Sequence, residues 1–233
     1  MTNSKFAHRS SGIEIMDDLN CSGEVVDQTL RELEFINRTL GGNTVTKDGV
    51  KKLLKKTQTK ALHILDLGCG GGDMLKLLHQ KLPTGTTFKG IDANPNIVQY
   101  AVKHSGKVPV ISFAAMDILS DEFKRETCDV AVATLFFHHF TDLQLVSILT
   151  NLHNQVRVGI VINDLHRHPL AYYSIRLLTW LFSKSSMVKY DAPLSVLRGF
   201  SKKELINILE RAGIENYTVK WKWAFRWQVI IGK

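Results

Sequence analysis

From residue 61 onward the sequence alternates short apolar stretches with helical ones, and this alternation constrains the fold more than any other feature. Apolar strands are predicted at 61–68, 86–92, 108–117, 128–136 and 157–165. Helices are predicted between them at 73–82, 95–104 and 143–156. Near-continuous apolar strands separated by helices indicate a parallel sheet that is covered on both faces.

The two ends of the chain read differently from this middle part. Residues 22–42 carry apolar side chains at helical spacing and stop at a glycine pair, and a second short helix is predicted at 46–56. Near the other end, Ser201 and Glu204 form the capping-box pattern of a helix that stops at Gly213. Two strands, 214–222 and 224–232, are expected to close the chain as a hairpin.

Composition excludes several classes of protein. The chain has 233 residues, 44% of them apolar and 22% charged, as is usual for one soluble globular domain. Three scattered cysteines argue against a disulfide framework, and the first residues lack the apolar run of a signal peptide, so a cytoplasmic location is expected. The most apolar segment, 170–182, is too short to span a bilayer and contains Arg176.

The net charge of +8 raises the question of a nucleic-acid partner. The basic residues are spread along the chain, with short runs at 51–56 and 220–227, and such runs usually form a solvated face. No nucleic acid is therefore expected as a partner. A peripheral contact with a membrane stays open.

The stretch "ILDLGCGGGDM", residues 64–74, is the sharpest motif. A strand runs through Asp66, a glycine-rich turn follows, and a helix begins near Asp73. In a doubly wound sheet, ligands bind beside such a turn at the carboxyl ends of the strands. A dinucleotide pattern would put glycine where Asp73 stands, and this acid would repel a pyrophosphate at the helix N-terminus. The turn suits a ligand with a cationic centre and an amino-acid portion.

Four motifs in this order resemble those of the class I S-adenosylmethionine-dependent methyltransferases. They are "DLGCGGG" with Asp66, Gly68, Gly70 and Gly72; "GIDANP" with Asp92 and Ala93; "AAMDIL" with Met116, Asp117 and Ile118; and "CDVAVATLFFHHF" with Leu135. The resemblance implies that these residues bind S-adenosylmethionine and its product S-adenosylhomocysteine. Asp92 would hold the ribose hydroxyls, and the third motif would contact the adenine.

The resemblance also implies a fold and a domain organisation. We expect an α/β domain at 59–233, with a Rossmann-like, seven-stranded, mostly parallel sheet, an antiparallel last strand and helices on both faces. Residues 1–58 are expected to form an N-terminal helical cap or lid. An insertion at about 165–200 is expected to contribute to the acceptor pocket.

The histidines of "TLFFHHFTD" follow the fourth strand, where cofactor and acceptor should meet. A phenol or enol oxygen is a better methyl acceptor after losing its proton, and histidine is the usual base near neutral pH. His139 and His166 are the expected bases, and His138 is a third candidate. Neighbours in a turn point apart, so one of the adjacent pair should face the reaction while the other supports it.

Metal chemistry is not expected, because a metal-assisted catechol-type site needs several converging carboxylates. Only Asp142 and Asp164 are available after strands four and five. Asp164 has an equally plain structural interpretation, as a cap of the helix that starts at Pro169.

The acceptor pocket is expected to include Phe136, Arg167, Tyr172 and Tyr173, within an aromatic segment that follows the fifth strand. The pattern resembles bacterial small-molecule methyltransferases that act on quinones or on products of type III polyketide synthases. The resemblance implies O-methylation of a small, hydrophobic phenolic or quinonoid acceptor in secondary metabolism. Alternatives are C-methylation of an activated ring, a non-catalytic S-adenosylmethionine-binding protein, and a methyltransferase for RNA or protein. The oligomeric state stays open.

Overall fold

The computed structural model describes residues 4–55, 61–106 and 108–233. The predicted boundary between residues 58 and 59 lies outside these residues, as does position 56, where the second predicted helix was expected to end. The described helix at that place covers Gly42–Leu54 (α2).

Seven strands form one sheet in the order β3-β2-β1-β4-β5-β7-β6. The strands are β1 (His63–Leu67), β2 (Thr87–Asp92), β3 (Ile111–Ala115), β4 (Cys128–Thr134), β5 (Val156–Leu165), β6 (Tyr217–Lys222) and β7 (Arg226–Gly232). Strands β1 to β5 pair in parallel, whereas β7 runs antiparallel to both of its neighbours. The predicted Rossmann-like sheet with an antiparallel last strand is thus confirmed.

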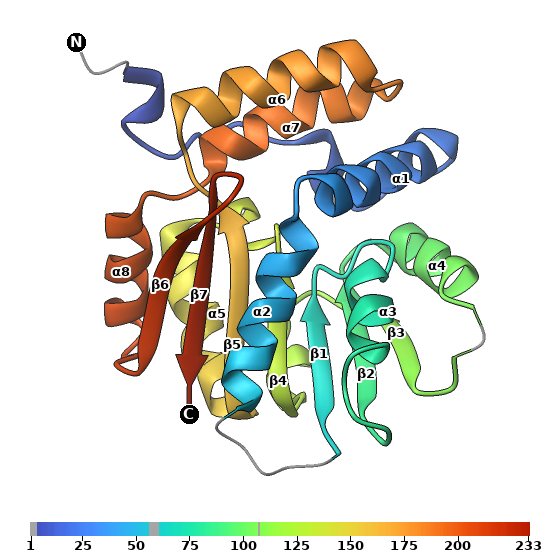
Figure 1. The fold of residues 1–233 in the computed structure, drawn as a ribbon, viewed down its shortest axis with the longest axis vertical. Helices are drawn as coiled ribbons and strands as arrows, with labels where there is room; N and C mark the ends of the chain where they lie inside the picture. The colour runs from blue at the N-terminus through green and yellow to red at the C-terminus, as the bar shows by residue number, and fades with distance from the viewer. Residues whose placement is uncertain (1–3, 56–60, 107) are drawn as a thin grey trace.

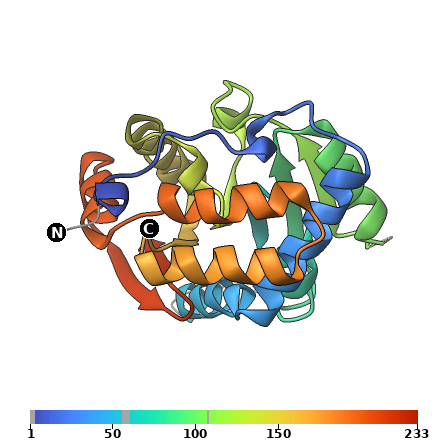
Figure 2. The ribbon, with the colours of Figure 1, turned by 90° about the horizontal axis from the view of Figure 1, so that it is seen from above.

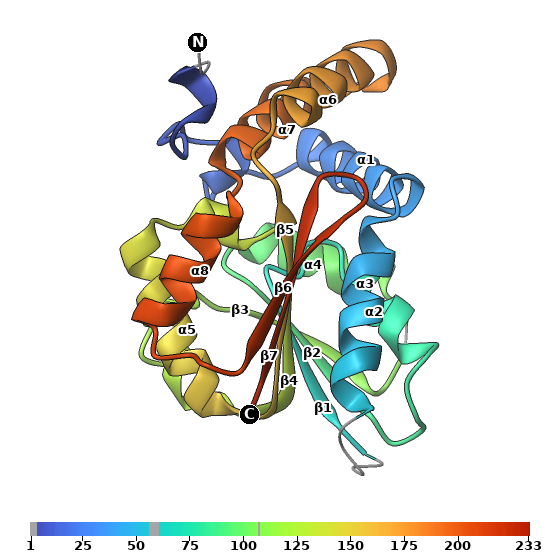
Figure 3. The same cartoon turned by 60° about the vertical axis from the view of Figure 1, so that its left-hand side comes forward.

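Helices cover both faces of this sheet (Figure 3). The remaining helices are α1 (Glu24–Thr39), α3 (Asp73–His79), α4 (Pro95–His104), α5 (Asp142–Gln155), α6 (Pro169–Phe182), α7 (Ser186–Arg198) and α8 (Lys202–Arg211). Helices α2 and α3 pack on one face, and α5 and α8 pack on the other. The predicted capping box of α8 is present, because Ser201 and Glu204 exchange both hydrogen bonds.

The alternation of β1 explains why both faces need helices. Leu65 and Leu67 join the apolar core under α5 and α8, while Ile64 joins the core under α2 and α3. A strand that is apolar on both sides is stable only when each side is covered. The acid of this strand, Asp66, is buried among these apolar neighbours at the end where the ligand turn begins.

A cap lies over the carboxyl ends of the parallel strands (Figures 1 and 2). It consists of α1, α6 and α7 and of the chain before α1, which includes the short 3₁₀ turns at Ser4–Phe6 and Ile15–Asp17. Helix α2 is different, because it packs on β4, β5 and β7 as part of the layer that covers the sheet. Only the first part of the expected N-terminal lid therefore lies over the strand ends.

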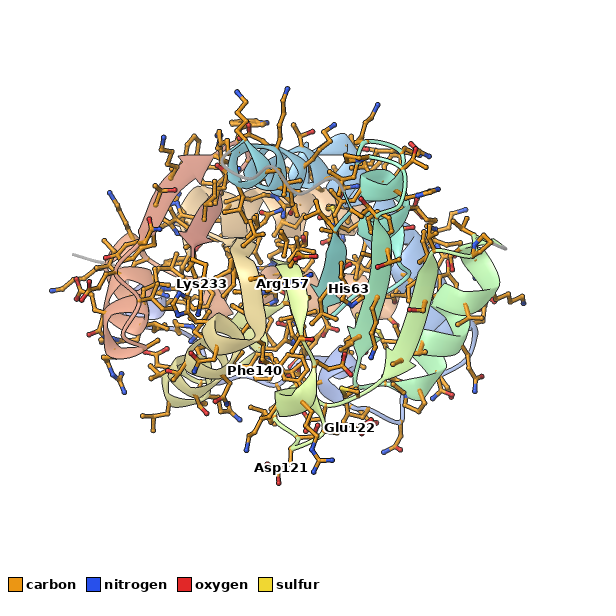
Figure 4. The ribbon with its side chains drawn as sticks, turned by 90° about the horizontal axis from the view of Figure 1, so that it is seen from below. His63, Asp121, Glu122, Phe140, Arg157 and Lys233 are labelled. Carbon is orange, nitrogen blue, oxygen red and sulfur yellow. The ribbon has the colours of Figure 1, made fainter. Side chains whose placement is uncertain are left out.

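The opposite end of the sheet, at the amino ends of β1 and β5, carries His63, Arg157 and the last residue, Lys233 (Figure 4). Arg157 donates to Asp129 over 2.8 Å there, and Asp129 also accepts the backbone N–H of His63. These side chains supply hydrogen-bond partners at the strand ends that face away from the cap.

Candidate active site

A cavity of about 880 Å³ opens between the cap and the carboxyl ends of β1, β2 and β4. Its walls come from the segment before α1, from α1 and α7, and from the turns that follow the strands. Most of the residues predicted to bind the cofactor line it, namely Asp66, Gly68, Gly70, Asp92, Ala93, Met116, Asp117, Ile118 and Leu135. Gly72 does not line it and instead caps the start of α3.

The turn after β1 depends on glycine for two separate reasons. Gly68 has a φ of +64°, a left-handed conformation that other residues adopt only with strain. A Cβ atom at this position would lie 2.1 Å from the ring of Phe136. The turn continues through Gly70, whose N–H donates to the Asp92 carboxylate over 3.2 Å. The backbone of this turn is therefore joined to the acid that ends β2.

Two buried carboxylates at this turn give the cavity an environment that favours a cationic ligand. Asp66 is fully buried, and its Oδ2 has no hydrogen-bond partner among the described residues. Burial, reinforced by the nearby Asp92, raises the pKa of Asp66 to about 8. Burial also raises the pKa of Asp92, although the N–H groups of Asn94 and Gly70 oppose this shift. Both acids are stabilised by a positively charged ligand, so these residues fit the amino and sulfonium groups of S-adenosylmethionine.

The raised pKa of Asp66 makes a prediction about stability. The folded-state pKa of Asp66 exceeds its ordinary value, so between about pH 4 and about pH 8 the unfolded chain releases the proton that the folded protein keeps. The free energy of unfolding therefore falls as the pH rises through this range. Without cofactor, the wild type should lose more unfolding free energy over this range than Asp66→Asn, which has no charge to bury. Urea unfolding at a series of pH values measures the difference. Parallel pH curves for the two proteins would contradict the proposed burial penalty.

The turn after β4 places two histidines at the cavity. Leu135 has a φ of +54°, uncommon for a residue with a side chain, and its N–H donates to the carbonyl of Asn163 over 2.8 Å. A 3₁₀ turn, Phe137–His139, follows at once. Strain held at one residue by its surroundings is a frequent property of functional sites. Here it directs the next turn, with both histidines, into the cavity.

His138 is held from behind by Asp164. Its Nδ1–H donates to the Oδ1 of Asp164 over 2.8 Å, and the N–H groups of Phe137 and His138 donate to Oδ2. Burial alone would raise the pKa of Asp164, but the adjacent His138 and these bonds hold it below its ordinary value. Asp164 thus orients His138 and does not cap α6, whose N-cap is His168.

His139 is held in the same way by an acid from the N-terminal segment. Its Nδ1–H donates to the Oδ1 of Asp17 over 2.5 Å, and Arg198 donates to the other oxygen over 2.5 Å. Burial opposes ionisation of Asp17, yet the bonds from His139 and Arg198 lower its pKa far below the usual range. His139 keeps 23% of its side-chain surface, against 3% for His138. The more accessible ring is therefore His139.

The remaining ring nitrogens of both histidines face Glu14. The Nε2 of His138 lies 3.7 Å from Oε1 of Glu14, and the Nε2 of His139 lies 4.0 Å from Oε2. Glu14 is only 4% exposed, and its Oε1 has no hydrogen-bond partner among the described residues. Burial raises its pKa to about 7 against the opposing effect of His139. Two carboxylate-held histidines thus converge on a third, buried acid whose pKa is raised toward neutral pH.

The same three side chains also have the composition of a metal site. One ligand atom each from Glu14, His138 and His139 can be chosen so that all lie within 4.8 Å of one another. Two histidines and one carboxylate, with further carboxylates on the outer ring nitrogens, are a common ligand set for divalent transition metals. Within the part of the chain that the structure describes, these three residues are the set that could hold a metal ion.

The segment before α1 reaches the site through a set of specific bonds. Arg9 donates to Asp142 over 2.6 Å and to the carbonyls of His138 and Phe140. The N–H groups of Ile15 and Met16 donate to Asp191 of α7. No motif in the sequence marks Glu14 or Asp17, so sequence reasoning missed both. The only signal was their nearness to each other in an acidic stretch, "EIMDD".

Four of the predicted catalytic and acceptor-pocket residues lie outside the cavity lining. His166 packs its ring against His168 and Trp227, and burial lowers its pKa. Arg167 is buried in an ion pair with Glu204, while Tyr172 accepts a bond from Lys5 and Tyr173 is exposed on α6. Of the predicted pocket residues, only Phe136 lines the cavity. The structure thus brings His138 and His139 together and leaves His166 apart.

Part of the chain is similar to known methyltransferases in sequence. Residues 64–159 match the family model described as a methyltransferase domain. The chain is 24% identical over 202 residues to the carboxy-S-adenosyl-L-methionine synthase of Helicobacter pylori strain P12, covering 82% of this chain and 81% of that protein. It is 26% identical over 172 residues to the enzyme of the same name from Helicobacter hepaticus, covering 69% and 71%.

Solved structures share the fold. The plantazolicin methyltransferase BpumL in complex with S-adenosylhomocysteine superposes with a TM-score of 0.64 at 18% identity, over 87% of this chain and 89% of that one. The magnesium protoporphyrin IX methyltransferase from Synechocystis PCC 6803, also with S-adenosylhomocysteine, gives a TM-score of 0.56 at 14% identity, over 86% and 87%. Residues 64–159 therefore match a methyltransferase domain, and the chain shares the fold of these two methyltransferases.

Proposed function

We propose that this methyltransferase moves a methyl group from S-adenosylmethionine to an oxygen of a small hydrophobic acceptor, of the phenolic or quinonoid kind. The observation that carries the proposal is the convergence of two carboxylate-held histidines on Glu14, inside the cavity that also holds the glycine turn. An oxygen acceptor needs a proton acceptor near neutral pH, and this cluster supplies one.

Different residues on the cofactor side of the cavity are proposed to contact different parts of the cofactor. Asp66 and Asp92 favour the cationic and hydroxyl-bearing parts of the cofactor, and Met116 and Ile118 offer apolar surface for its ring system. When bound, the cofactor supplies a methyl group on a positively charged sulfur. Gly68 and Gly70 let the backbone approach it closely. The protein then has to align the acceptor and exclude water.

His139 is the proposed base, because its ring is the more accessible of the two and lines the cavity. The acceptor hydroxyl gives its proton to Nε2, while Nδ1–H stays bonded to Asp17. The ionised Asp17 stabilises the positive ring that results, as does the proximity of Glu14. His138 and Asp164 hold the turn from behind. Phe136 and Phe140 add apolar walls that suit an aromatic acceptor.

The two Helicobacter relatives are named as synthases of carboxy-S-adenosyl-L-methionine. The residues that line the cavity argue against this synthase activity in the present protein. A carboxylate transferred within the site would need a free cation beside it. Arg9 and Arg198, the two arginines that line the cavity, are already bonded to Asp142, Asp17 and the carbonyls of the histidine turn. We therefore favour methyl transfer. Mass spectrometry of the nucleoside that copurifies with the protein distinguishes the two.

A second candidate follows from the ligand set of Glu14, His138 and His139. A divalent cation held by these residues would lower the pKa of an acceptor hydroxyl without a protein base. In that case exhaustive chelation abolishes turnover and added metal restores it. Turnover that persists after chelation supports the histidine base.

The test of the main proposal combines binding with turnover. Isothermal titration with S-adenosylhomocysteine should show one site, and incubation with a panel of phenols and hydroxyquinones should give products heavier by one methyl group. Hydrolysis and NMR of the product separate O-methylation from C-methylation. Absence of binding at high micromolar ligand would sink the proposal. Binding without turnover on any acceptor would instead favour a non-catalytic binding protein.

A further inference from the structure

Helix α6 presents an unusual surface on the outside of the cap (Figures 1 and 2). Only Ala171, Tyr172 and Thr179 of this helix are buried. Most of its exposed side chains are large and apolar, namely Leu170, Tyr173, Leu177, Leu178, Trp180, Leu181 and Phe182. Trp180 is 69% exposed and Phe182 is 76% exposed. An apolar surface this dense on a soluble domain marks an interaction site.

The surface continues onto the hairpin between β6 and β7. Trp223 is 70% exposed at the tip of this hairpin, and its ring lies 6.5 Å from that of Phe225. Phe225 in turn stacks on His168, at the start of α6, with ring centroids 5.1 Å apart. The hairpin tip and the first turn of α6 thus belong to one continuous face, which we call the α6 face.

The charged side chains on α6, on the turn after it and on α7 as far as residue 190 are all basic, and Glu32 of α1 contributes one carboxylate at this turn, where it accepts the N–H of Lys184. Between residues 165 and 190 the sequence contains no aspartate or glutamate. Arg176, Lys184 and Lys189 are exposed on α6, on the turn after it and on α7. Aromatic and aliphatic side chains bordered by basic ones are the pattern of a helix that lies in the plane of a membrane.

The length of α6 and the charge of the α6 face favour a lipid surface as its binding partner. Helix α6 has 14 residues, and no helix in the described part of the chain has the length and apolar character to cross a bilayer. A second copy of the chain, docked about a two-fold axis, would bring the basic residues of both copies together. An anionic lipid surface complements the same charges and takes up the apolar side chains.

We propose that the α6 face docks on anionic membranes, with Trp180 and Phe182 inserted into the boundary between headgroups and acyl chains. Helix α7 lies between this face and the cavity, because Val188, Ala192 and Arg198 line the cavity while α6 does not. Docking therefore places the cavity roof close to the lipid, where hydrophobic molecules partition. The inference rests on the α6 face and the basic residues beside it, and stands whether or not methyl transfer is the activity.

The test is sedimentation of the full chain with vesicles. The protein should sediment with vesicles that contain phosphatidylglycerol, and more weakly with pure phosphatidylcholine. The double substitution Trp180→Ser, Phe182→Ser should lower partitioning by about tenfold or more, because two large apolar side chains leave the lipid. Lys184→Glu with Lys189→Glu should weaken binding to the anionic vesicles alone and reduce its dependence on salt, because Arg176 is then the one basic residue of the three that remains.

A matched control is Leu143→Ser on α5. Leu143 is 72% exposed but lies away from the α6 face, so this change should leave partitioning unaltered. Thermal unfolding and S-adenosylhomocysteine titration report whether each variant is folded, independently of vesicle binding. Equal, weak sedimentation of wild type and double variant would overturn the proposal. So would a dimer in light scattering that the double substitution abolishes, because the α6 face would then be an interface between copies.

Discussion

Replacing His139 with glutamine is expected to lower kcat by about 10²–10⁴-fold, the usual contribution of a general base. Glutamine keeps a similar reach but cannot accept a proton near neutral pH. The loss should appear in kcat, because the substitution leaves the glycine turn and Asp66 intact. Single-turnover assays with saturating cofactor and acceptor measure it directly, and S-adenosylhomocysteine titration verifies that the variant still binds the cofactor.

His166→Gln is the matched control for this experiment. His166 also follows a strand at the same edge of the sheet, but its ring packs outside the cavity lining. Its substitution should leave kcat near the wild-type value. If His139→Gln loses less than tenfold, alignment alone accounts for the rate and no histidine base is needed. If His166→Gln shows the large loss, the base has been assigned to the wrong residue.

Gly68→Ala is expected to remove most of the affinity for S-adenosylhomocysteine. The new methyl group would lie 2.1 Å from the Phe136 ring, and the φ of +64° would be retained only with strain. Overpacking costs about 1–3 kcal/mol and the left-handed conformation about 1–2 kcal/mol. If the turn avoids this cost by leaving its binding geometry, a comparable free energy is lost from binding. The affinity should then fall on the order of 100-fold, because each 1.4 kcal/mol is about tenfold in Kd.

Gly213→Ala is the control that distinguishes the effect of backbone strain from that of a steric clash in Gly68→Ala. Gly213 has a φ of +72°, but nothing lies within 4 Å of the place where its Cβ would stand. This variant should lose a little thermal stability and bind S-adenosylhomocysteine as the wild type does. Titration calorimetry and thermal unfolding of both variants give the comparison. Wild-type affinity in a folded Gly68→Ala would show that the turn does not have to approach the ligand closely.

The sheet and the placement of the glycine turn and its acids in the candidate site could be predicted because local sequence determines them. The period of apolar residues sets strands and helices, and the carboxyl ends of parallel strands meet at one edge. Asp66, Gly68 and Asp92 each stand at a strand end that the pattern locates. Their meeting in one cavity follows from the topology, and the hydrogen bond between Gly70 and Asp92 is its direct result.

The acid–base half could not be predicted, because it depends on contacts between distant parts of the chain. Glu14 and Asp17 lie more than 120 residues from His138 and His139, and no periodicity or spacing relates them. The expectation that carboxylates fail to converge here considered only acids that follow the strands. The role of Asp164 could not be predicted either. An acid at this position is expected both if it caps α6 and if it orients a histidine. Only the bond from His138 Nδ1 decides between them.

The N-terminal segment and α7 are tied to each other beside the proposed base. Asp17 is bonded to Arg198, Glu14 to Ser195, and Ile15 to Asp191. Displacement of the segment from α7 would therefore take Asp17 away from His139, and Glu14 away from both histidines. The proposed base would be complete only while the segment lies against α7, so its strength would depend on the first twenty residues of the chain.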